Sequence, residues 1–66
     1  MDKIEYYLGR FGEEQFLFAD LKPYNYPNNG DFIFFKDEMY KVMYSLYDYD
    51  NGDLSVFVRM AILEDF

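Results

Sequence analysis

The acidic segment Asp48-Tyr49-Asp50-Asn51-Gly52-Asp53 contains the residue types that come nearest to a metal site. Carboxylate and amide oxygens are the hard ligands that Ca²⁺ prefers. A helix–loop–helix calcium loop, however, has glycine at its sixth position and a bidentate glutamate at its twelfth. Counted from Asp48, glycine falls at the fifth position and the cation Arg59 at the twelfth. The segment therefore predicts a solvated turn, and we expect neither a metal ion nor another cofactor.

Groups that could carry out catalysis are scarce in this sequence. It contains no His or Cys, and its aliphatic hydroxyl groups are those of Ser45 and Ser55. A nucleophile and base of the usual kinds cannot be assembled from these residues. Paired carboxylates fall in expected turns or in the tail, where water surrounds them and no cleft perturbs either acid: Glu13-Glu14, Asp37-Glu38 and Glu64-Asp65. We therefore predict that the protein is not an enzyme.

The charge of the chain restricts its partners. Thirteen acidic and six basic residues give a net charge of −7, and the basic residues form no cluster. Such a chain repels nucleic-acid phosphates, so we exclude direct nucleic-acid binding and expect a protein partner with a basic surface. Solubility alone is the competing explanation for the acids. With no export signal and no apolar run long enough to span a membrane, we expect a cytoplasmic protein that does not bind membranes.

Aromatic residues are unusually abundant, with 8 Phe and 8 Tyr in 66 residues. They supply apolar surface for one small domain over residues 1–66, although no disulfide can stabilise it. Phe, Tyr, Met, Ile, Asn and Lys together make up nearly half of the chain. These residues have AT-rich codons, so the composition favours an AT-rich bacterium or its phage as the source.

Strand-forming residues dominate from Asp31 to Leu63. We expect a three-stranded antiparallel meander over residues 31–36, 39–48 and 54–63. A turn centred on Asp37-Glu38 would close its first hairpin, pairing Phe35 with Tyr40 and Ile33 with Val42.

Asn51-Gly52 marks the second hairpin. We expect a three-residue loop, Asp50-Asn51-Gly52, in which Gly52 is left-handed and forms a bulge. This register pairs Leu46 with Val56, Tyr44 with Val58 and Val42 with Met60. It places an apolar set on one face: Tyr40, Val42, Tyr44, Leu46, Leu54, Val56, Val58, Met60 and Ile62.

The N-terminal third is less regular. Ile4, Tyr6 and Leu8 alternate with other residues, which predicts a strand. Residues 16–18 suit either a second strand or a short helix over residues 13–21. Residues 23–30 contain both prolines and three of the four asparagines, which predicts a turn-rich loop between this segment and the meander.

These elements predict an all-β fold, or β with one short N-terminal helix. The meander would close into a small barrel or a two-layer sheet. The stretch Gly30-Asp31-x-Ile33-x-Phe35 followed by Tyr40-x-Val42 resembles a strand entry common in the Src-homology-3-like class of small barrels. The resemblance covers residues 30–42 and implies an architecture without an activity, because such barrels have many unrelated functions.

The outer face of the expected meander carries Phe32, Phe34, Met43, Tyr47 and Phe57, which is too apolar for a solvated sheet. Either the N-terminal segment covers it, or another chain does. We expect a non-enzymatic protein-binding module that acts by occupancy, namely a phage or mobile-element inhibitor of a host enzyme or defence complex in the host cytoplasm. Its expected partner-binding residues are Tyr47, Asp48, Tyr49, Asp50, Asp53 and Phe57.

Two other functions fit the same composition. One is a homo-oligomeric structural or assembly protein that self-associates through the aromatic face. The other is a small-ligand sponge that binds a nucleotide-like molecule between aromatic rings, although the chain has no glycine-rich phosphate loop.

Overall fold

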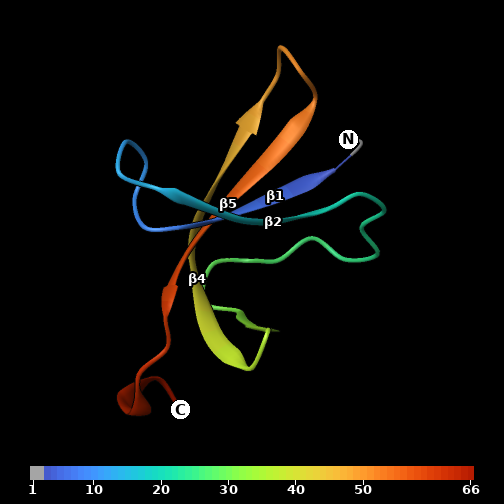
Figure 1. Ribbon diagram of the computed structural model, residues 1–66. Coiled ribbons are helices and arrows are strands. Elements are labelled where there is room, and N and C mark those ends of the chain that lie inside the picture. The colour runs from blue at the N-terminus through green and yellow to red at the C-terminus, as the bar shows by residue number, and fades with distance from the viewer. Residues whose placement is uncertain (1–2) are drawn as a thin grey trace.

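The structure is a computed structural model that describes residues 3–66. Its strands form one curled sheet shaped like half of a barrel (Figure 1). The strands are β1 (Ile4–Leu8), β2 (Gln15–Asp20), β3 (Phe32–Phe35), β4 (Glu38–Asp48) and β5 (Asp53–Met60), followed by one short 3₁₀ helix, η1 (Leu63–Asp65). The predicted all-β fold is confirmed. The open choice for residues 13–21 is settled as a strand, β2.

The strands lie in the order β2-β1-β5-β4-β3. The meander β3-β4-β5 is antiparallel, as predicted. The N-terminal hairpin β1-β2 joins it because β1 pairs with β5 in parallel. Strands β2 and β3 therefore form the two edges of the sheet. Among residues 3–66, no helix is long and apolar enough to cross a membrane.

The hairpin between β3 and β4 turns at Lys36-Asp37, one residue earlier than predicted. Both residues are left-handed, with φ of 49° and 65°, as a type I′ turn requires. Ile33 therefore lies opposite Tyr40 instead of Val42. The shift is by two residues, so the predicted face of this hairpin is unchanged.

The predicted register of the β4–β5 hairpin is wrong. Asp48 pairs with Asp53, which leaves a four-residue loop, although Gly52 is left-handed as expected, with φ of 74°. The Asp48 carboxylate accepts hydrogen bonds from the backbone N–H groups of Asp50 (2.9 Å) and Asn51 (3.3 Å) and from the Asn51 side chain (2.9 Å). These bonds start the turn at Asp48, an effect of Asp in turns that hydrophobic alternation does not reveal.

A bulge in β4 divides the apolar face that the sequence predicted. The register shifts between Val42 and Tyr44, so Met43 is the extra residue. Beyond it, Tyr44 and Leu46 lie on the opposite face from Val42. The predicted set is therefore only partly correct: Tyr40, Val42, Val56 and Val58 are buried together, whereas Leu46, Met60 and Ile62 are exposed.

The core lies on the concave face of the sheet, where Ile4 and Tyr6 of β1 join the buried residues of β4 and β5. Phe18 of β2 stacks on Tyr6, with ring centroids 4.5 Å apart, and on Phe35 of β3, at 4.0 Å. The two edge strands themselves stay apart, with no Cα atoms within 8 Å of each other. Aromatic rings therefore close the core at the point where the barrel wall is open.

Candidate protein-binding surface

A second aromatic cluster lies on the opposite, convex face of the sheet. Phe57 is at its centre and is only 2% exposed. Its ring lies 5.6 Å from that of Tyr7, 6.1 Å from Phe11 and 5.1 Å from Tyr44. Phe16 packs edge-on against Tyr7, with centroids 5.6 Å apart. We call these five residues the convex cluster.

The burial of Phe57 corrects one predicted site residue. Phe57 was expected to anchor a partner, but the N-terminal hairpin and Tyr44 cover it. The reason is that β1 pairs with β5, which places Tyr7 beside Phe57. This long-range pairing covers part of the outer face with the N-terminal segment, which is one of the two alternatives that the sequence allowed. Phe57 supports the surface from below and is not available to contact a partner.

The turn between β1 and β2 holds the outer rings of the convex cluster in place. The Phe11 backbone N–H donates to the Tyr44 hydroxyl (2.9 Å), and the Gly9 N–H donates to the Val58 carbonyl (2.9 Å). Gly9 has a φ of 106° and an added Cβ would lie 3.2 Å from a backbone oxygen, so glycine is required there. Phe11 is consequently fixed above Phe57 while remaining 66% exposed.

Three carboxylates act on Tyr7 of this cluster, and one of them, that of Glu5, lies 4.0 Å from the Lys3 Nζ. The pKa of the Tyr7 hydroxyl is raised, first by burial and then by the negative charges of Glu5, Glu14 and Asp53. These acids come from β1, the β1–β2 turn and β5, and the strand pairing brings them to one face. We call Tyr7, Phe11 and Phe16, together with these three acids, the acidic–aromatic face. Sequence reasoning missed Glu5 and Glu14 because their positions depend on strand pairing: Glu5 lies opposite Ser55, two residues from Asp53, and Glu14 lies beyond the other end of β1.

The structure divides the predicted tip site between two directions. Asp48 and Asp53 oppose each other at the end of the convex face. Tyr47 lies opposite Leu54 and therefore on the other face, where its ring meets that of Tyr49 edge-on at 4.6 Å. Both rings are exposed, as is Asp50. The predicted residues are close in sequence but do not form one continuous surface.

Asp48 has a structural role that the sequence did not indicate. Its pKa is lowered by hydrogen bonds from the Asn51 side chain and from the Asn51 and Asp50 backbones, which favour the charged form. A substitution at Asp48 would therefore disturb the turn as well as the surface charge. Asp50 and Asp53 are the tip acids that can be changed to test surface charge alone.

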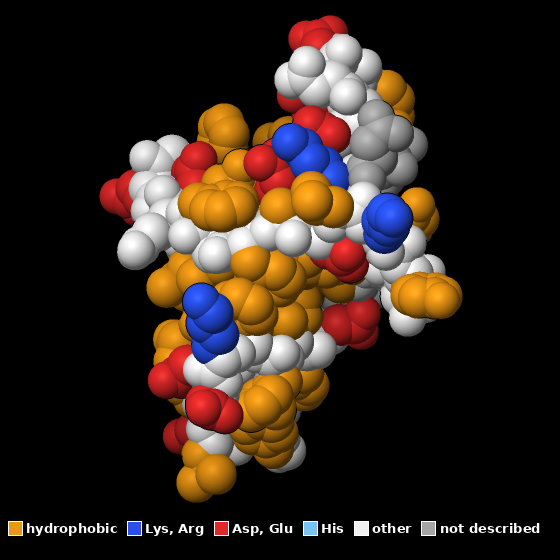
Figure 2. Space-filling model, turned by 45° about the vertical axis from the view of Figure 1, so that its right-hand side comes forward, with side chains coloured by type: hydrophobic (Ala, Val, Ile, Leu, Met, Phe, Trp, Pro, Cys, Tyr) orange, Lys and Arg blue, Asp and Glu red, His pale blue; other side chains and the backbone are white. Residues whose placement is uncertain are grey.

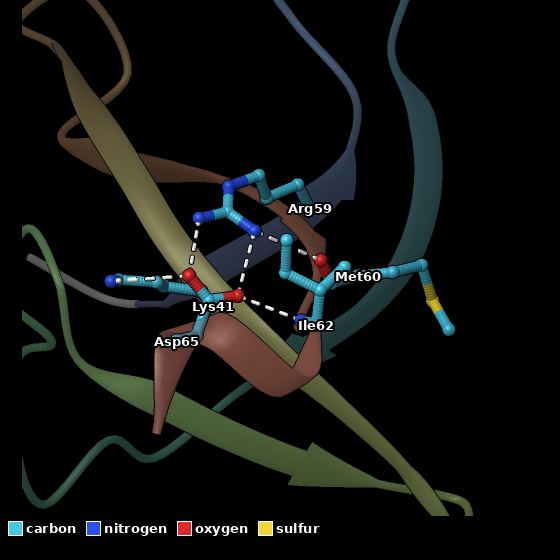
Figure 3. A network of polar contacts seen from close by, with 5 residues as sticks. All are labelled: Lys41, Arg59, Met60, Ile62 and Asp65. Atoms are coloured by element: carbon cyan, nitrogen blue, oxygen red, sulfur yellow. Dashed lines mark hydrogen bonds and ion pairs between the residues drawn. The ribbon is translucent and has the colours of Figure 1, made fainter.

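A charged cluster at the opposite end of the convex face was also missed. Lys41 and Arg59 face each other across β4 and β5, and Asp65 of η1 lies between them (Figure 3). The Arg59 guanidinium donates two hydrogen bonds to the carboxylate, at 2.8 and 2.9 Å, and the Lys41 Nζ lies 3.5 Å away. The Ile62 N–H donates a further bond of 2.7 Å.

This environment holds the pKa of the Asp65 carboxyl far below its usual range, chiefly through the Arg59 hydrogen bonds and then that of Ile62. The Asp65 side chain is only 8% exposed. Treating Glu64-Asp65 as a solvated pair was therefore wrong for Asp65. Two bases that face each other across a hairpin indicate that an acid lies between them. The register predicted from the sequence was incorrect and did not pair Lys41 with Arg59.

An open groove of about 400 Å³ lies between the loop after β2 and the start of β3. Its lining residues are Tyr6, Asn25, Tyr26, Pro27, Asp31, Phe32 and Ile33. The charged residue in this lining is an acid, which would repel a nucleotide-like anion. Among residues 3–66, no three carboxylates gather closely enough to hold a metal ion.

Comparison of the chain with known proteins found no matching family model, no matching curated protein and no matching solved structure.

Proposed function

We propose that the protein is a non-enzymatic binding module that acts by occupying a basic surface of another protein. The acidic–aromatic face carries this proposal. Exposed aromatic rings are the side chains that most often anchor protein interfaces, and Phe57 gives them a rigid base. The surrounding acids would steer the face toward positive charge and exclude acidic partners.

The amount of exposed apolar surface supports this proposal. Fourteen large hydrophobic side chains of the described residues are exposed. Figure 2 shows such side chains side by side across one face, with charged groups mainly toward its margins. Soluble proteins that act alone rarely expose large continuous apolar patches, whereas binding proteins do.

The setting we propose is a phage or mobile element in an AT-rich bacterium, where the protein would block a host enzyme or defence complex in the cytoplasm. The codon-linked composition and the acidic charge support this setting. A basic surface on such a partner would commonly be one that binds nucleic acid, and an acidic occupant would compete for it. The small-ligand alternative is not carried forward, because the charged residue of the groove is acidic.

The test begins with capture of a partner from the lysate of an AT-rich bacterium and continues with the purified partner. We expect the double variant Asp50→Lys/Asp53→Lys to weaken binding at least tenfold, mainly through slower association. The matched control is Glu38→Lys/Glu64→Lys, which changes the net charge equally at the other end of the molecule. Both of its positions are exposed, and we expect it to bind as the unmodified protein does.

Salt provides a second arm of the same test. Raising it from about 0.05 to about 0.5 M should weaken binding of the unmodified protein, since screening shortens the reach of surface charge. Equal weakening by both double variants would mean that net charge acts and this face does not. Binding that is indifferent to salt and to both variants would refute the electrostatic mechanism.

A further inference from the structure

The outer edge of β3 has unused backbone hydrogen-bonding groups. The Val42 N–H donates to the Asp31 carbonyl at 2.8 Å, so alternate residues from Asp31 onward bond to β4. The N–H and carbonyl groups of Phe32 and Phe34 therefore point away from β4. Within residues 3–66, no side chain and no backbone group outside the sheet hydrogen-bonds to either residue. This edge can accept another strand.

Nothing on β3 protects this edge from pairing. Its four residues, Phe32-Ile33-Phe34-Phe35, include no charge and no proline, which are the usual means of blocking an edge strand. Phe34 is 65% exposed. The open groove runs beside Asp31, Phe32 and Ile33, so the preceding loop leaves space along the start of the strand.

The charges at the two edges of the sheet determine which of them can pair with a second copy. Strand β2 ends in Asp20 and is preceded by Glu14, so antiparallel copies of β2 would bring acids together at both ends. Strand β3 lies between Asp31 and Lys36, so antiparallel copies would bring an acid beside a base at both ends. Self-pairing is thus favoured at β3 and opposed at β2.

We propose that β3 pairs in an antiparallel manner with β3 of a second copy about a two-fold axis. Paired residues must point to the same face, so Ile33 lies opposite Ile33 of the second copy and Phe32 opposite Phe34. These two Phe positions are the ones with unused backbone groups, and each pair exchanges two hydrogen bonds. Phe66, which stacks on Phe32 at 4.8 Å, enlarges the aromatic contact.

A second copy fits this edge better than an unrelated strand because the edge is complementary to itself in both charge and register. The nearby bases Arg59 and Lys41 share one partner, Asp65, which offsets one of their two positive charges. The remaining opposition is the charge of −7 on each copy. Salt screens this repulsion, so the dimer strengthens with salt, whereas binding of the proposed basic partner weakens. The two proposals can therefore fail separately.

The experiment measures sedimentation of the purified protein over a range of concentrations at low and high salt. We expect a concentration-dependent dimer whose dissociation constant falls as salt rises. Phe34→Lys should raise that constant at least tenfold. Tyr24→Lys is the matched control, because it makes the same charge change at a loop residue that is 99% exposed, and it should leave the dimer intact.

Hydrogen exchange of the unmodified protein gives a readout that needs no variant. The amides of Phe32 and Phe34 should exchange more slowly in concentrated than in dilute protein, while that of Gln15 at the start of β2 should not change. A monomer at all concentrations up to about 1 mM would overturn the proposal, since an affinity weaker than this has little consequence. A dimer in which the Phe32 and Phe34 amides remain unprotected would overturn it equally.

Discussion

Both ends of the convex face contain aromatic rings and charged side chains, but the two ends arrange them differently. At the β1–β5 end, Glu5, Glu14 and Asp53 surround the rings, and their charge acts on Tyr7. At the β3 end, Asp65 is bound by Arg59 and Lys41. The first end is therefore net negative, although Lys3 lies 4.0 Å from Glu5, whereas the second has one acid paired with two bases.

This difference has a consequence for association. A net negative charge attracts a basic protein and repels a second copy of the same chain. The cluster of Asp65 with its two bases has no net negative charge, so it adds no such repulsion and leaves the apolar edge of β3 to determine what binds. Under the two proposals, one small sheet separates binding of a partner from binding of a second copy. The three predictions below test whether the two ends differ as described.

Phe57→Ala should give the largest effect, because Phe57 holds the acidic–aromatic end together. Removing a buried Phe ring should lower the free energy of unfolding by about 3–5 kcal/mol. Tyr49→Ala is the control, since that exposed ring contacts Tyr47 alone among the aromatic residues described here, and it should change stability by less than about 0.5 kcal/mol. Urea unfolding measures both. Similar costs for the two variants would show that the convex cluster does not hold the N-terminal hairpin.

Asp65→Asn tests the ion pairs at the β3 end. Because folding lowers the pKa of Asp65, its contribution to stability is present at pH values above the unfolded pKa of about 3.9 and is lost as pH falls toward the lower folded pKa. The unmodified protein should therefore melt at a higher temperature than the variant at pH 7, and the difference should shrink progressively below about pH 4.

Glu64→Gln is the control for that experiment, because Glu64 is an exposed neighbour of Asp65. Its melting temperature should follow that of the unmodified protein across the same pH range. If Asp65→Asn also does so, the ion pairs do not stabilise η1. The pairing of Asp65 with its two bases would then have no measurable effect on the stability of this end.

The sequence predicted the strands of this fold better than their registers and their pairing. Alternating apolar residues and the Asn51-Gly52 turn identified the meander, and Val42, Val56 and Val58 were assigned to the core. The start of the turn at Asp48 depends on particular hydrogen bonds and, like the bulge at Met43, it shifts a register without changing the hydrophobic pattern.

The candidate site was harder to predict for a related reason. Exposure of Tyr47, Tyr49 and Asp50 followed from their place at a hairpin tip. Burial of Phe57 did not, because it depends on the parallel pairing of β1 with β5, which are separated by most of the chain. The acidic–aromatic face is a product of that pairing, so no local motif could have identified it.

The two hairpin turns extend the comparison to the smallest effects. At the acidic end, Gly52 has a φ of 74° and an added Cβ would meet nothing within 4 Å, so Gly52→Ala measures backbone strain alone. It should lower the free energy of unfolding by about 1 kcal/mol.

At the β3 end, Asp37 has a φ of 65° without being glycine. Asp37→Gly relieves that strain and should raise stability by about 0.5 kcal/mol, because the added freedom of the unfolded chain offsets part of the gain. Opposite signs in urea unfolding would confirm that the two turns are left-handed for different reasons, one through glycine and the other imposed by strand pairing. A loss of stability in both variants would show that the Asp37 side chain makes a contribution larger than the strain it causes.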